Sequence, residues 1–485
     1  MLTGKTIYTR TLLLALLMMA GNRMQAQIAL AGESLLFSTK ESVPRGDTNS
    51  VYTVVDFELE GNKHTREMII LRELPFEQGE RYTLSELMER SRDARSRLLN
   101  TGLFLEVVVG IERGEGEEAI VRVTVKERWY FVPMPVLDVV GKSYQQWLQE
   151  GMPTGYLRYG VNIKHKNLTG LNDRLSVNLL NGYQKELSFV YEGLPLDYRL
   201  RWTANLAFQM GQQRDVQYTT EYNKPKALHA DNQFLYSYTR LQASLNYRPA
   251  IKTRHSFAFA WNDESFRDTV SKANTSFFYN LSRAQYAEIS YQMSYQDVDF
   301  APYPTRGLEG EFLLSKKGLD AGPINQWLLR ARASWYKPLT EKTFVNFRAT
   351  GMVKAPFKQP YRQQGFVAGN DMFLQGYEPY TIDGVAGGFV KASIHRRIVD
   401  SKVGIKLKRF PQLASVPIKI YAKAYVNGGY IYNESPGTSF LNNQLLHSAG
   451  VGVDIVLFYD FTFRVEFSLN ANGQNGLYLH DRNRW

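Results

Sequence analysis

Residues 475–485 read NGLYLHDRNRW and close a long series of segments in which apolar and polar residues alternate. Successive side chains of a strand point to opposite faces, so Leu477, Leu479 and Trp485 share one face and mostly polar residues occupy the other. A last strand that is apolar on one face and ends on an aromatic residue is typical of a membrane-spanning β-barrel. The stretch therefore directs the question of function toward a membrane.

The same alternation continues through the region that follows Trp129. Around residue 205 the polar set, expected to face a lumen, is Arg199, Arg201, Thr203, Asn205 and Gln209, and the apolar set, expected to face lipid, is Leu200, Trp202, Ala204, Leu206 and Phe208. We expect about sixteen such strands, each close to the ~9–11 residues that a tilted membrane strand requires. An even number places both ends of the barrel on the same side of the membrane, the periplasmic side.

The composition is compatible with this fold. Beyond residue 20 no segment approaches the ~18 consecutive apolar residues of a spanning helix, so a chain that crosses the bilayer must do so as a closed barrel. The 30 Tyr and 7 Trp suit membrane interfaces, although aromatic residues also suit a soluble β-sandwich. The net charge of +11 is dispersed at strand spacing, which argues against nucleic-acid binding and favours a basic lumen or acidic lipid head groups.

The N-terminal region predicts export. The positively charged Lys5 and Arg10 precede a short apolar core at 11–20, a pattern that indicates a secretory signal peptide over residues 1–26. A flexible lead is expected to follow over residues 27–50. The chain has no cysteine, so it forms no disulfide, carries no lipid-anchor cysteine and has no thiolate metal site.

A compact α+β unit is predicted before the barrel, in the order β-α-α-β-β. Thr83 and Glu86 have the spacing of a capping box at the start of the second helix, and Gly102 lies where a left-handed residue ends it. The expected elements are a strand at 51–60, helices at 65–71 and 83–100, and strands at 105–111 and 119–125.

This order resembles a POTRA (polypeptide-transport-associated) domain over residues 51–128. The resemblance rests on Gly61-Asn62, on the run LNTGLF at 99–104 and on VKER at 125–128. The barrel would then occupy residues 129–485.

One connection inside the barrel, residues 354–387, is unusually long and lacks alternation. Long ordered loops are usually functional. Placed between the eleventh and twelfth strands, it resembles the in-folded sixth loop of the BamA/TamA superfamily of outer-membrane assembly and translocation proteins, and YPTRG at 303–307 is similar to the start of a strand in that family. The resemblance spans residues 51–485 and implies a barrel in the outer membrane of a Gram-negative bacterium with a periplasmic POTRA domain.

The loop motif departs from the family pattern. The family has an arginine that reaches a strand-borne aspartate, whereas here the matching positions are Gln375, before Gly376 and Tyr377, and Asn427, two residues before Gly429. Losing both charges avoids a lone buried charge, so we expect a Gln375–Asn427 hydrogen bond that keeps the loop docked. The alternative is unrelated change at the two positions and a loose loop.

The resemblance implies that the protein handles unfolded outer-membrane or secreted polypeptides. An exposed sheet edge can pair with an extended chain through main-chain hydrogen bonds. By the same resemblance, the POTRA edge is the strand at 105–111, and the residues expected to bind a client are Leu105, Glu106, Val107, Val108 and Val109. We expect Leu105, Val107, Val109 and Ile111 to face the helices and Glu106 and Val108 to face outward, unless the edge is solvated and unused.

A lateral seam between the first and last strands is the second expected element. Pro133 and Pro135 lack ladder donors, which predicts weak closure against the last strand, with Leu477, Leu479 and Trp485 at the seam. Alternatively, the two prolines lie in a linker before the barrel.

A rival interpretation is a passive pore or structural barrel whose POTRA domain is a docking tether. No catalytic, cofactor or metal site is predicted, since no histidine lies in a nucleophile motif and metal-binding pairs are missing. Asp297 and Asp299 could hold calcium weakly, but a solvated loop is favoured. Membrane lipid is an expected partner, accessory periplasmic or lipoprotein subunits are left open, and the client is unnamed.

Overall fold

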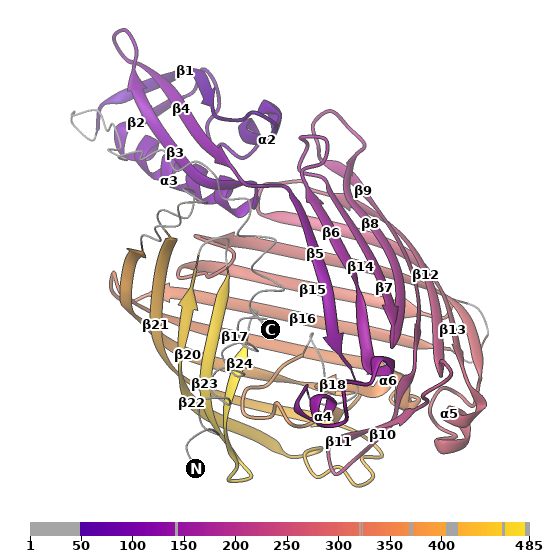
Figure 1. Cartoon of the computed structure of the whole chain (residues 1–485). Coiled ribbons are helices and arrows are strands. Elements are labelled where there is room, and N and C mark those ends of the chain that lie inside the picture. Colours follow the sequence, from indigo (N-terminus) through magenta and orange to yellow (C-terminus); the bar gives the residue numbers. More distant parts are fainter. Residues whose placement is uncertain are drawn as a thin grey trace.

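The computed structural model describes residues 49–140, 144–319, 322, 324–367, 372–403, 416–457 and 461–480. The expected signal peptide, nearly all of the expected lead and Trp485 lie outside these residues. The described chain forms a small α+β domain followed by a sixteen-stranded antiparallel sheet that curls into a barrel (Figure 1). The predicted fold class and strand number are therefore confirmed.

The small domain has the predicted order with one short additional strand. Its four-stranded sheet runs β2-β1-β4-β3, with β1 parallel to β4 and the other pairs antiparallel. The elements are β1 (Val51–Glu60), α2 (Glu67–Leu71), β2 (Arg81–Thr83), α3 (Leu84–Asn100), β3 (Phe104–Arg113) and β4 (Glu118–Glu127). This is the arrangement expected of a POTRA domain, with β3 at one edge of the sheet.

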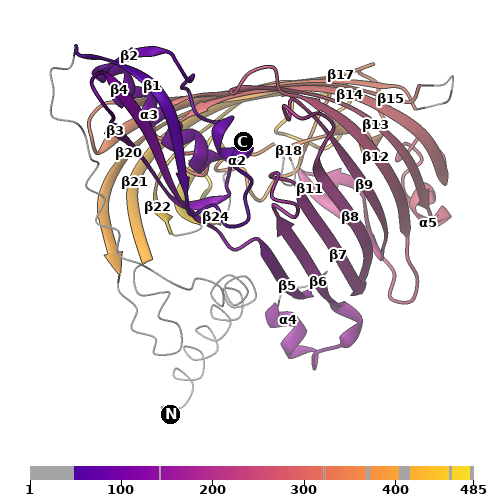
Figure 2. The same ribbon diagram turned by 90° about the horizontal axis from the view of Figure 1, so that it is seen from above.

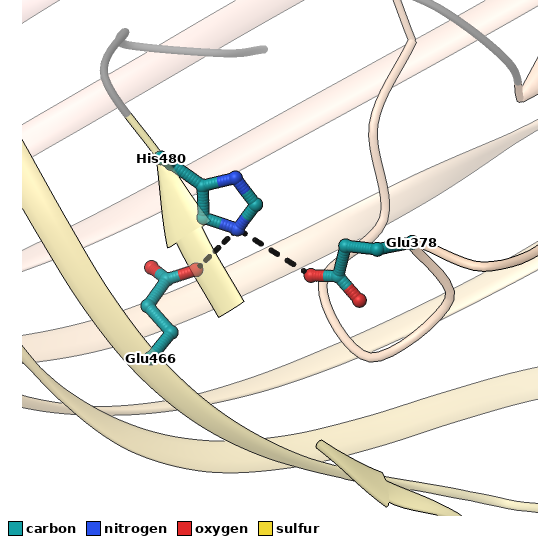
Figure 3. A group of neighbouring side chains, drawn as sticks. All are labelled: Glu378, Glu466 and His480. Atoms are coloured by element: carbon teal, nitrogen blue, oxygen red, sulfur yellow. Dashed lines mark ion pairs between the residues drawn. The ribbon is translucent and has the colours of Figure 1, made fainter. Parts of the chain in front are cut away.

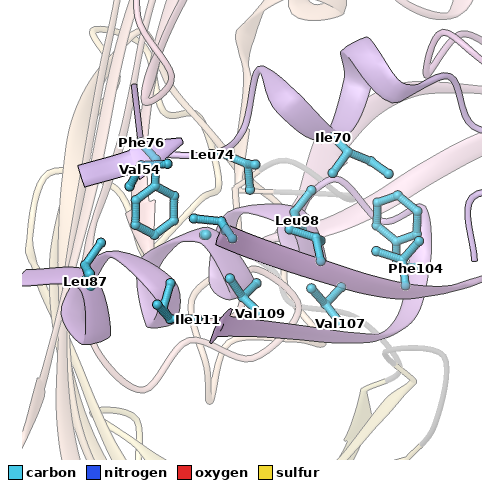
Figure 4. Close-up of a cluster of buried hydrophobic side chains, with 14 of the residues drawn as sticks. Val54, Ile70, Leu74, Phe76, Leu87, Leu98, Phe104, Val107, Val109 and Ile111 are labelled. Carbon is cyan, nitrogen blue, oxygen red and sulfur yellow. The ribbon is translucent and has the colours of Figure 1, made fainter. Parts of the chain in front are cut away.

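Local sequence explains both ends of α3. The Glu86 N–H donates to Thr83 Oγ1 at 3.2 Å and the Thr83 N–H donates to Glu86 Oε2 at 2.8 Å, which completes the predicted capping box. Gly102 follows the helix with φ +72°, a left-handed conformation that favours glycine. The helix is thereby positioned to bury Leu87 and Leu98 completely against the sheet (Figure 4).

The expected orientation of β3 needs one correction. Val107, Val109 and Ile111 are buried as predicted, but Leu105 is only half-buried, and Phe104 takes its place in the core with 0% exposure (Figure 4). The register of β3 against β4 shifts between Phe104 and Glu106, so an extra residue is accommodated there. Strict alternation fails across such a bulge because the extra residue reverses the facing of those before it.

The barrel sheet runs without interruption from β5 to β24 in chain order. Its strands are β5 (Phe131–Val139), β6 (Leu157–Lys166), β7 (Arg174–Gly182), β8 (Gln184–Pro195), β9 (Trp202–Gln213), β12 (Tyr236–Tyr247), β13 (Thr253–Phe266), β14 (Arg283–Val298), β15 (Gly307–Lys317), β16 (Gln326–Pro338), β17 (Thr343–Ala355), β20 (Ala386–Val403), β21 (Val416–Tyr432), β22 (Leu445–Val456), β23 (Thr462–Asn470) and β24 (Asn475–His480). The long loop joins β17 to β20, the eleventh and twelfth strands, as predicted.

The remaining elements lie in the connections between barrel strands. They are α4 (Tyr144–Gln149), η1 (Thr154–Tyr156), β10 (Asp215–Glu221), β11 (Lys224–His229), α5 (Asp268–Ala273), α6 (Tyr361–Gln364), β18 (Gly365–Val367) and β19 (Ile382–Asp383). In the described part of the chain, none of the helices combines the length and apolar character needed to cross a bilayer.

The outer surface of the barrel carries large apolar side chains at every second position. On β13, for example, Phe257 and Phe259 are 51% and 50% exposed. The expectation for Leu200 was wrong: β9 begins at Trp202, and Leu200 lies in the preceding turn, buried against the core of the POTRA domain. Alternation predicts facing only within a strand, and here the strand starts two residues later.

The POTRA domain rests on the periplasmic rim of the barrel. Glu73, in the segment after α2, is 3% exposed, and its carboxylate accepts hydrogen bonds from Arg248 Nη1 at 2.5 Å and Arg248 Nη2 at 2.8 Å. At the end of α3, Asn100 donates to the Val298 carbonyl at 2.8 Å and accepts from the Ala301 N–H at 2.8 Å. The turn between β6 and β7 contributes further contacts, since the Arg66 N–H donates to the Gly170 carbonyl at 3.0 Å. Several barrel turns thus hold different POTRA elements.

The Glu73–Arg248 pair is the charged contact of this interface. Burial alone would raise the pKa of Glu73, but the hydrogen bonds and charge of Arg248, together with the charge of Arg72, outweigh it and leave the pKa below its usual value. The docked form therefore binds fewer protons than a released form. Docking is strongest above the ordinary pKa of glutamate and weakens as the pH falls through the lowered pKa of Glu73.

We expect Glu73→Gln to loosen this docking by about 3 kcal/mol, because it leaves Arg248 without its buried carboxylate. The chain has no cysteine, so two cysteines introduced at the exposed Glu89 and Glu341 can be spin-labelled specifically. The distance between the labels then runs from α3 of the POTRA domain to the barrel turn between β16 and β17. The distance distribution should broaden in the variant and, in the wild type, on acidification. Glu117→Gln, which removes an exposed POTRA ion pair with Arg81, is the matched control and should leave it narrow. An unchanged distribution in Glu73→Gln would contradict the assignment.

Candidate functional site

The long loop folds into the barrel and is held there by an apolar cluster. Leu374 and Tyr377 are each 1% exposed, and they pack with Phe389 on β20 and Ile431 on β21. The Tyr377 hydroxyl donates to the His447 carbonyl at 3.0 Å. The loop is therefore docked, which removes the alternative of a loose loop.

Gln375 is docked, but its partner differs from the expected one. Its side-chain amide donates to Glu466 Oε1 on β23 at 2.8 Å. Its backbone carbonyl accepts a hydrogen bond from Ser448 Oγ at 2.5 Å. Asn427 donates instead to Ser448 Oγ at 2.9 Å. The predicted Gln375–Asn427 hydrogen bond was therefore wrong, because the amide nitrogen of Gln375 goes to Glu466 and that of Asn427 goes to Ser448, its neighbour across the strand pair. The loop meets a carboxylate after all, supplied by a different strand.

Gly376 in the loop and Gly429 on β21 are both at positions where a larger side chain would clash. Gly376 has φ +87°, and an added Cβ would come within 3.0 Å of Ser448 Cβ. Its carbonyl also accepts from Asn470 Nδ2 at 2.8 Å. Gly429 lies opposite Phe389, and an added Cβ there would come within 3.0 Å of Phe389 Cβ. Gly376 lets the loop approach the wall, and Gly429 makes room for an aromatic of the cluster that holds it.

A row of buried charges crosses the wall beneath the loop. Lys423 on β21 is 8% exposed, and its Nζ lies 2.6 Å from Asp454 Oδ1 and 2.5 Å from Glu466 Oε1. Gly452 lies opposite both Lys423 and Glu466, on the strand between theirs. An added Cβ on Gly452 would come within 3.1 Å of Lys423 Cε, so the glycine lets the two side chains meet across it.

The turn before β15 also reaches this row. The Tyr303 hydroxyl donates to Asp454 Oδ2 at 2.9 Å, and Asp299 accepts from the Thr305 N–H and hydroxyl at 2.9 and 2.6 Å. Asp297 instead accepts from Lys252 Nζ at 2.7 Å. The two aspartates thus serve a turn and an ion pair.

Alternation predicts polar residues at lumen-facing positions in general, but it neither singles out nor pairs these three. Lys423, Asp454 and Glu466 sit on three different strands, and their meeting depends on the register between those strands. The only sequence signal is charge at lumen-facing positions of successive strands, which many barrel residues share. With the loop they line a cavity of ≈ 70 Å³.

The first barrel strand includes both prolines, so they do not lie in a linker. The Val140 N–H, just beyond β5, donates to the Tyr156 carbonyl at 2.9 Å, and the register of β5 against β6 is continuous. The even-numbered residues of β5 therefore direct their backbone N–H and C=O groups toward β6. Pro133 and Pro135 lie at the positions whose backbone groups point to the opposite, unpaired edge of β5. That edge lacks two donors where a neighbouring strand would need them.

The last strand presents its own unpaired edge. The Asn470 N–H donates to the Gln474 carbonyl at 3.0 Å, so even-numbered residues of β24 face β23, and Leu477 and Leu479 direct their backbone groups away from it. β24 pairs with β23 alone and β5 with β6 alone among the described strands. Figures 1 and 2 show β5 and β24 apart at the two ends of the curved sheet.

The POTRA sheet has a third free edge, on β3. The Gly114 N–H donates to the Glu118 carbonyl at 2.9 Å, so even-numbered residues face β4, and Val107, Val109 and Ile111 direct their backbone groups outward. The Val107 carbonyl already accepts from Arg95 Nε at 3.0 Å. The open part of the edge therefore begins at Val109, further along β3 than the sequence suggested.

Comparisons with known proteins agree with this architecture. Residues 167–472 match the Omp85 superfamily domain, and residues 52–128 match the POTRA family described as surface antigen variable number repeat. The outer membrane protein assembly factor BamA of Neorickettsia risticii (strain Illinois) is 30% identical over 128 residues, or 26% of this chain. The match spans only 15% of the length of that relative.

Solved structures show a similar fold at low sequence identity. CdiB from Escherichia coli matches with a TM-score of 0.50 and 12% identity, covering 89% of this chain and 74% of that one. BamA from Haemophilus ducreyi lacking POTRA domains 1–3 matches with a TM-score of 0.44 and 14% identity, covering 89% and 83%.

The barrel and the α+β domain on its rim define the class: an outer-membrane β-barrel protein with a periplasmic POTRA domain. Because the Omp85 match covers well over half of the chain, the protein belongs to the Omp85 superfamily.

We expect Gly376→Ala to release the loop from the wall. The substitution strains a left-handed residue, at a cost of about 1–3 kcal/mol, and places a Cβ against Ser448. Gly473→Ala is the matched control, since Gly473 also has positive φ but nothing lies within 4 Å of an added Cβ. Limited proteolysis of folded protein in detergent should cut within residues 356–385 faster in Gly376→Ala than in Gly473→Ala. Equal rates would show that the close approach at Ser448 does not hold the loop.

Proposed function

We propose that the protein assists the insertion, assembly or translocation of polypeptides at the outer membrane. The observation that carries the proposal is the pair of unpaired strand edges at the barrel seam, where β5 and β24 each lack a second partner in the described chain. A membrane barrel that is only a wall has no use for such edges, because unsatisfied backbone groups are costly in lipid. An edge that pairs with a client strand would have its backbone N–H and C=O groups hydrogen-bonded while the client is bound.

The two edges are unequal in what they can accept. On β24, the N–H and C=O groups of Leu477 and Leu479 are intact, so an extended client can add there by ordinary main-chain pairing. On β5, Pro133 and Pro135 remove donors from the edge. We therefore infer that a client strand pairs first with β24, while β5 supplies a weakly zipped and easily released border.

The POTRA edge would act earlier, on the periplasmic side. Main-chain pairing does not depend on client sequence, which suits a factor that meets unfolded outer-membrane or secreted polypeptides. Of the residues expected at this edge, Val109 offers both backbone groups, whereas the carbonyl of Val107 is engaged by Arg95. Glu106, Val108 and the half-buried Leu105 would flank the client through their side chains.

The alternative is a passive pore or a structural barrel with POTRA as a docking tether. The docked Glu73–Arg248 contact suits a tether. The in-folded loop does not suit an open pore, because it is held against the inner wall by an apolar cluster and by the hydrogen bond from the Tyr377 hydroxyl. The polypeptide-handling function is therefore favoured.

Photo-crosslinking in living cells tests the proposal. Probes at Glu106 and Val108 on β3 and at Leu479 on β24 should form adducts with several newly made exported polypeptides. A probe at Glu89, exposed on α3, is the control and should give none of these adducts. Adducts at Leu479 to lipid alone, together with one stable partner at Glu106, would instead support the tethered structural barrel.

A further inference from the structure

Three side chains from distant parts of the chain converge inside the barrel beneath the loop (Figure 3). Glu378 belongs to the in-folded loop, Glu466 to β23 and His480 to the end of β24. His480 Nε2 lies 3.2 Å from Glu466 Oε2 and 3.5 Å from Glu378 Oε1. One ligand-capable atom of each residue falls within 4.8 Å of the others.

The group is buried and its facing atoms are incompletely satisfied. The side chains of Glu466, His480 and Glu378 are 1%, 7% and 13% exposed. Both carboxylate oxygens of Glu378, Oε2 of Glu466 and Nε2 of His480 are buried without a hydrogen-bond partner. Apart from the ion-pair contacts that His480 makes with the two carboxylates, these atoms have no partner among the described residues. Buried polar atoms are normally hydrogen-bonded, so several that are not, around a common point, indicate a missing binding partner.

We propose that these three residues form a binding site for a divalent transition-metal cation, of which Zn²⁺ is the best fit. Imidazole nitrogen and carboxylate oxygen are both zinc ligands, and three protein ligands leave a fourth tetrahedral position for water. Tetrahedral bonds of about 2.0–2.1 Å place neighbouring ligand atoms about 3.3 Å apart. The distances from His480 to the two carboxylates lie on either side of that value.

The surroundings orient the ligands. Gln375 and Lys423 hold the other oxygen of Glu466, at 2.8 and 2.5 Å, which leaves Oε2 turned toward the site. Lys423 also contacts Asp454, so its positive charge is shared between Glu466 and a carboxylate outside the three ligands. The edge of the Phe373 ring packs on the imidazole, with 4.8 Å between ring centroids. Such outer contacts fix ligand orientation in metal sites.

A bound cation would connect three parts of the barrel. It would join the loop to β23 and to β24, the closing strand, which otherwise pairs with β23 alone among the described strands. The cation would therefore fasten the end of β24 to the lumen side. This inference does not rest on the proposed function.

A second histidine provides an internal contrast. His229 lies in a loop hairpin, with Nδ1 at 2.6 Å from Asp215 and Nε2 at 2.9 Å from Asp231. The two carboxylates therefore lie at different nitrogens of the ring, so one cation cannot bind a ring nitrogen and both carboxylates together. The carboxylates at His480 address the same nitrogen. His229 is the matched control.

The test is isothermal titration of Zn²⁺ into the full-length protein, purified in detergent and stripped with chelator. We expect one site, with affinity reduced more than about tenfold by Glu378→Gln and by His480→Gln and unchanged by His229→Gln. Glu378→Gln is the most informative variant, because Glu378 has no hydrogen bond to lose in the described structure. Co²⁺ bound at the site should give the intense visible absorption of tetrahedral coordination.

Two results would overturn the proposal. Wild-type protein that binds no Zn²⁺ would show that His480 instead balances the carboxylates as a charged imidazolium. Binding that survives both Glu378→Gln and His480→Gln would place the cation elsewhere. Comparing the gel mobility of each variant before and after heating shows whether its barrel is folded. A loss of Zn²⁺ binding that results from misfolding is thereby recognised.

Discussion

The barrel interior depends on one buried cation, Lys423. Its ammonium group lies between Asp454 and Glu466, and each carboxylate in turn accepts a hydrogen bond from a segment outside the barrel strands. Asp454 receives Tyr303 from a periplasmic turn, and Glu466 receives Gln375 from the loop. Since a buried charge without a partner costs about 3–5 kcal/mol, the row, the turn and the loop are stable together rather than one by one.

This arrangement explains how the loop remains docked without the arginine of the family pattern. The carboxylate is present in the wall, but on β23, and its charge is met by Lys423 from β21. Gln375 then needs to supply only a neutral hydrogen bond. A second cation at position 375 would repel Lys423, so a neutral amide is the compatible choice here.

The structure combines a firmly held interior with unpaired edges. The loop is held against the charged row inside the barrel, and Glu73 anchors the POTRA domain to the rim. The edges of β5, β24 and β3 each lack a neighbour in the described chain. Exposed edges invite pairing with other chains, and natural barrels normally abolish them by closure. Their persistence beside a rigid interior points to use in binding extended polypeptide.

Sequence alone determined the class of the protein. Alternation of period two predicted a sixteen-stranded barrel, because facing in a strand is a local property, and the capping box with Gly102 predicted α3 for the same reason. Local rules failed where an extra residue reversed the facing at Leu105, and where a turn carried Leu200 into the POTRA core.

Only the tertiary structure decided which lumen residues meet. Gln375 met Glu466 rather than Asn427, and the carboxylates of Glu378 and Glu466 both met the imidazole of His480. These pairings depend on strand register and on the path of a docked loop, which no spacing along the chain contains. The free edges of β5 and β24 were likewise suggested by two prolines, but which side of β5 lacks donors followed only from its pairing with β6.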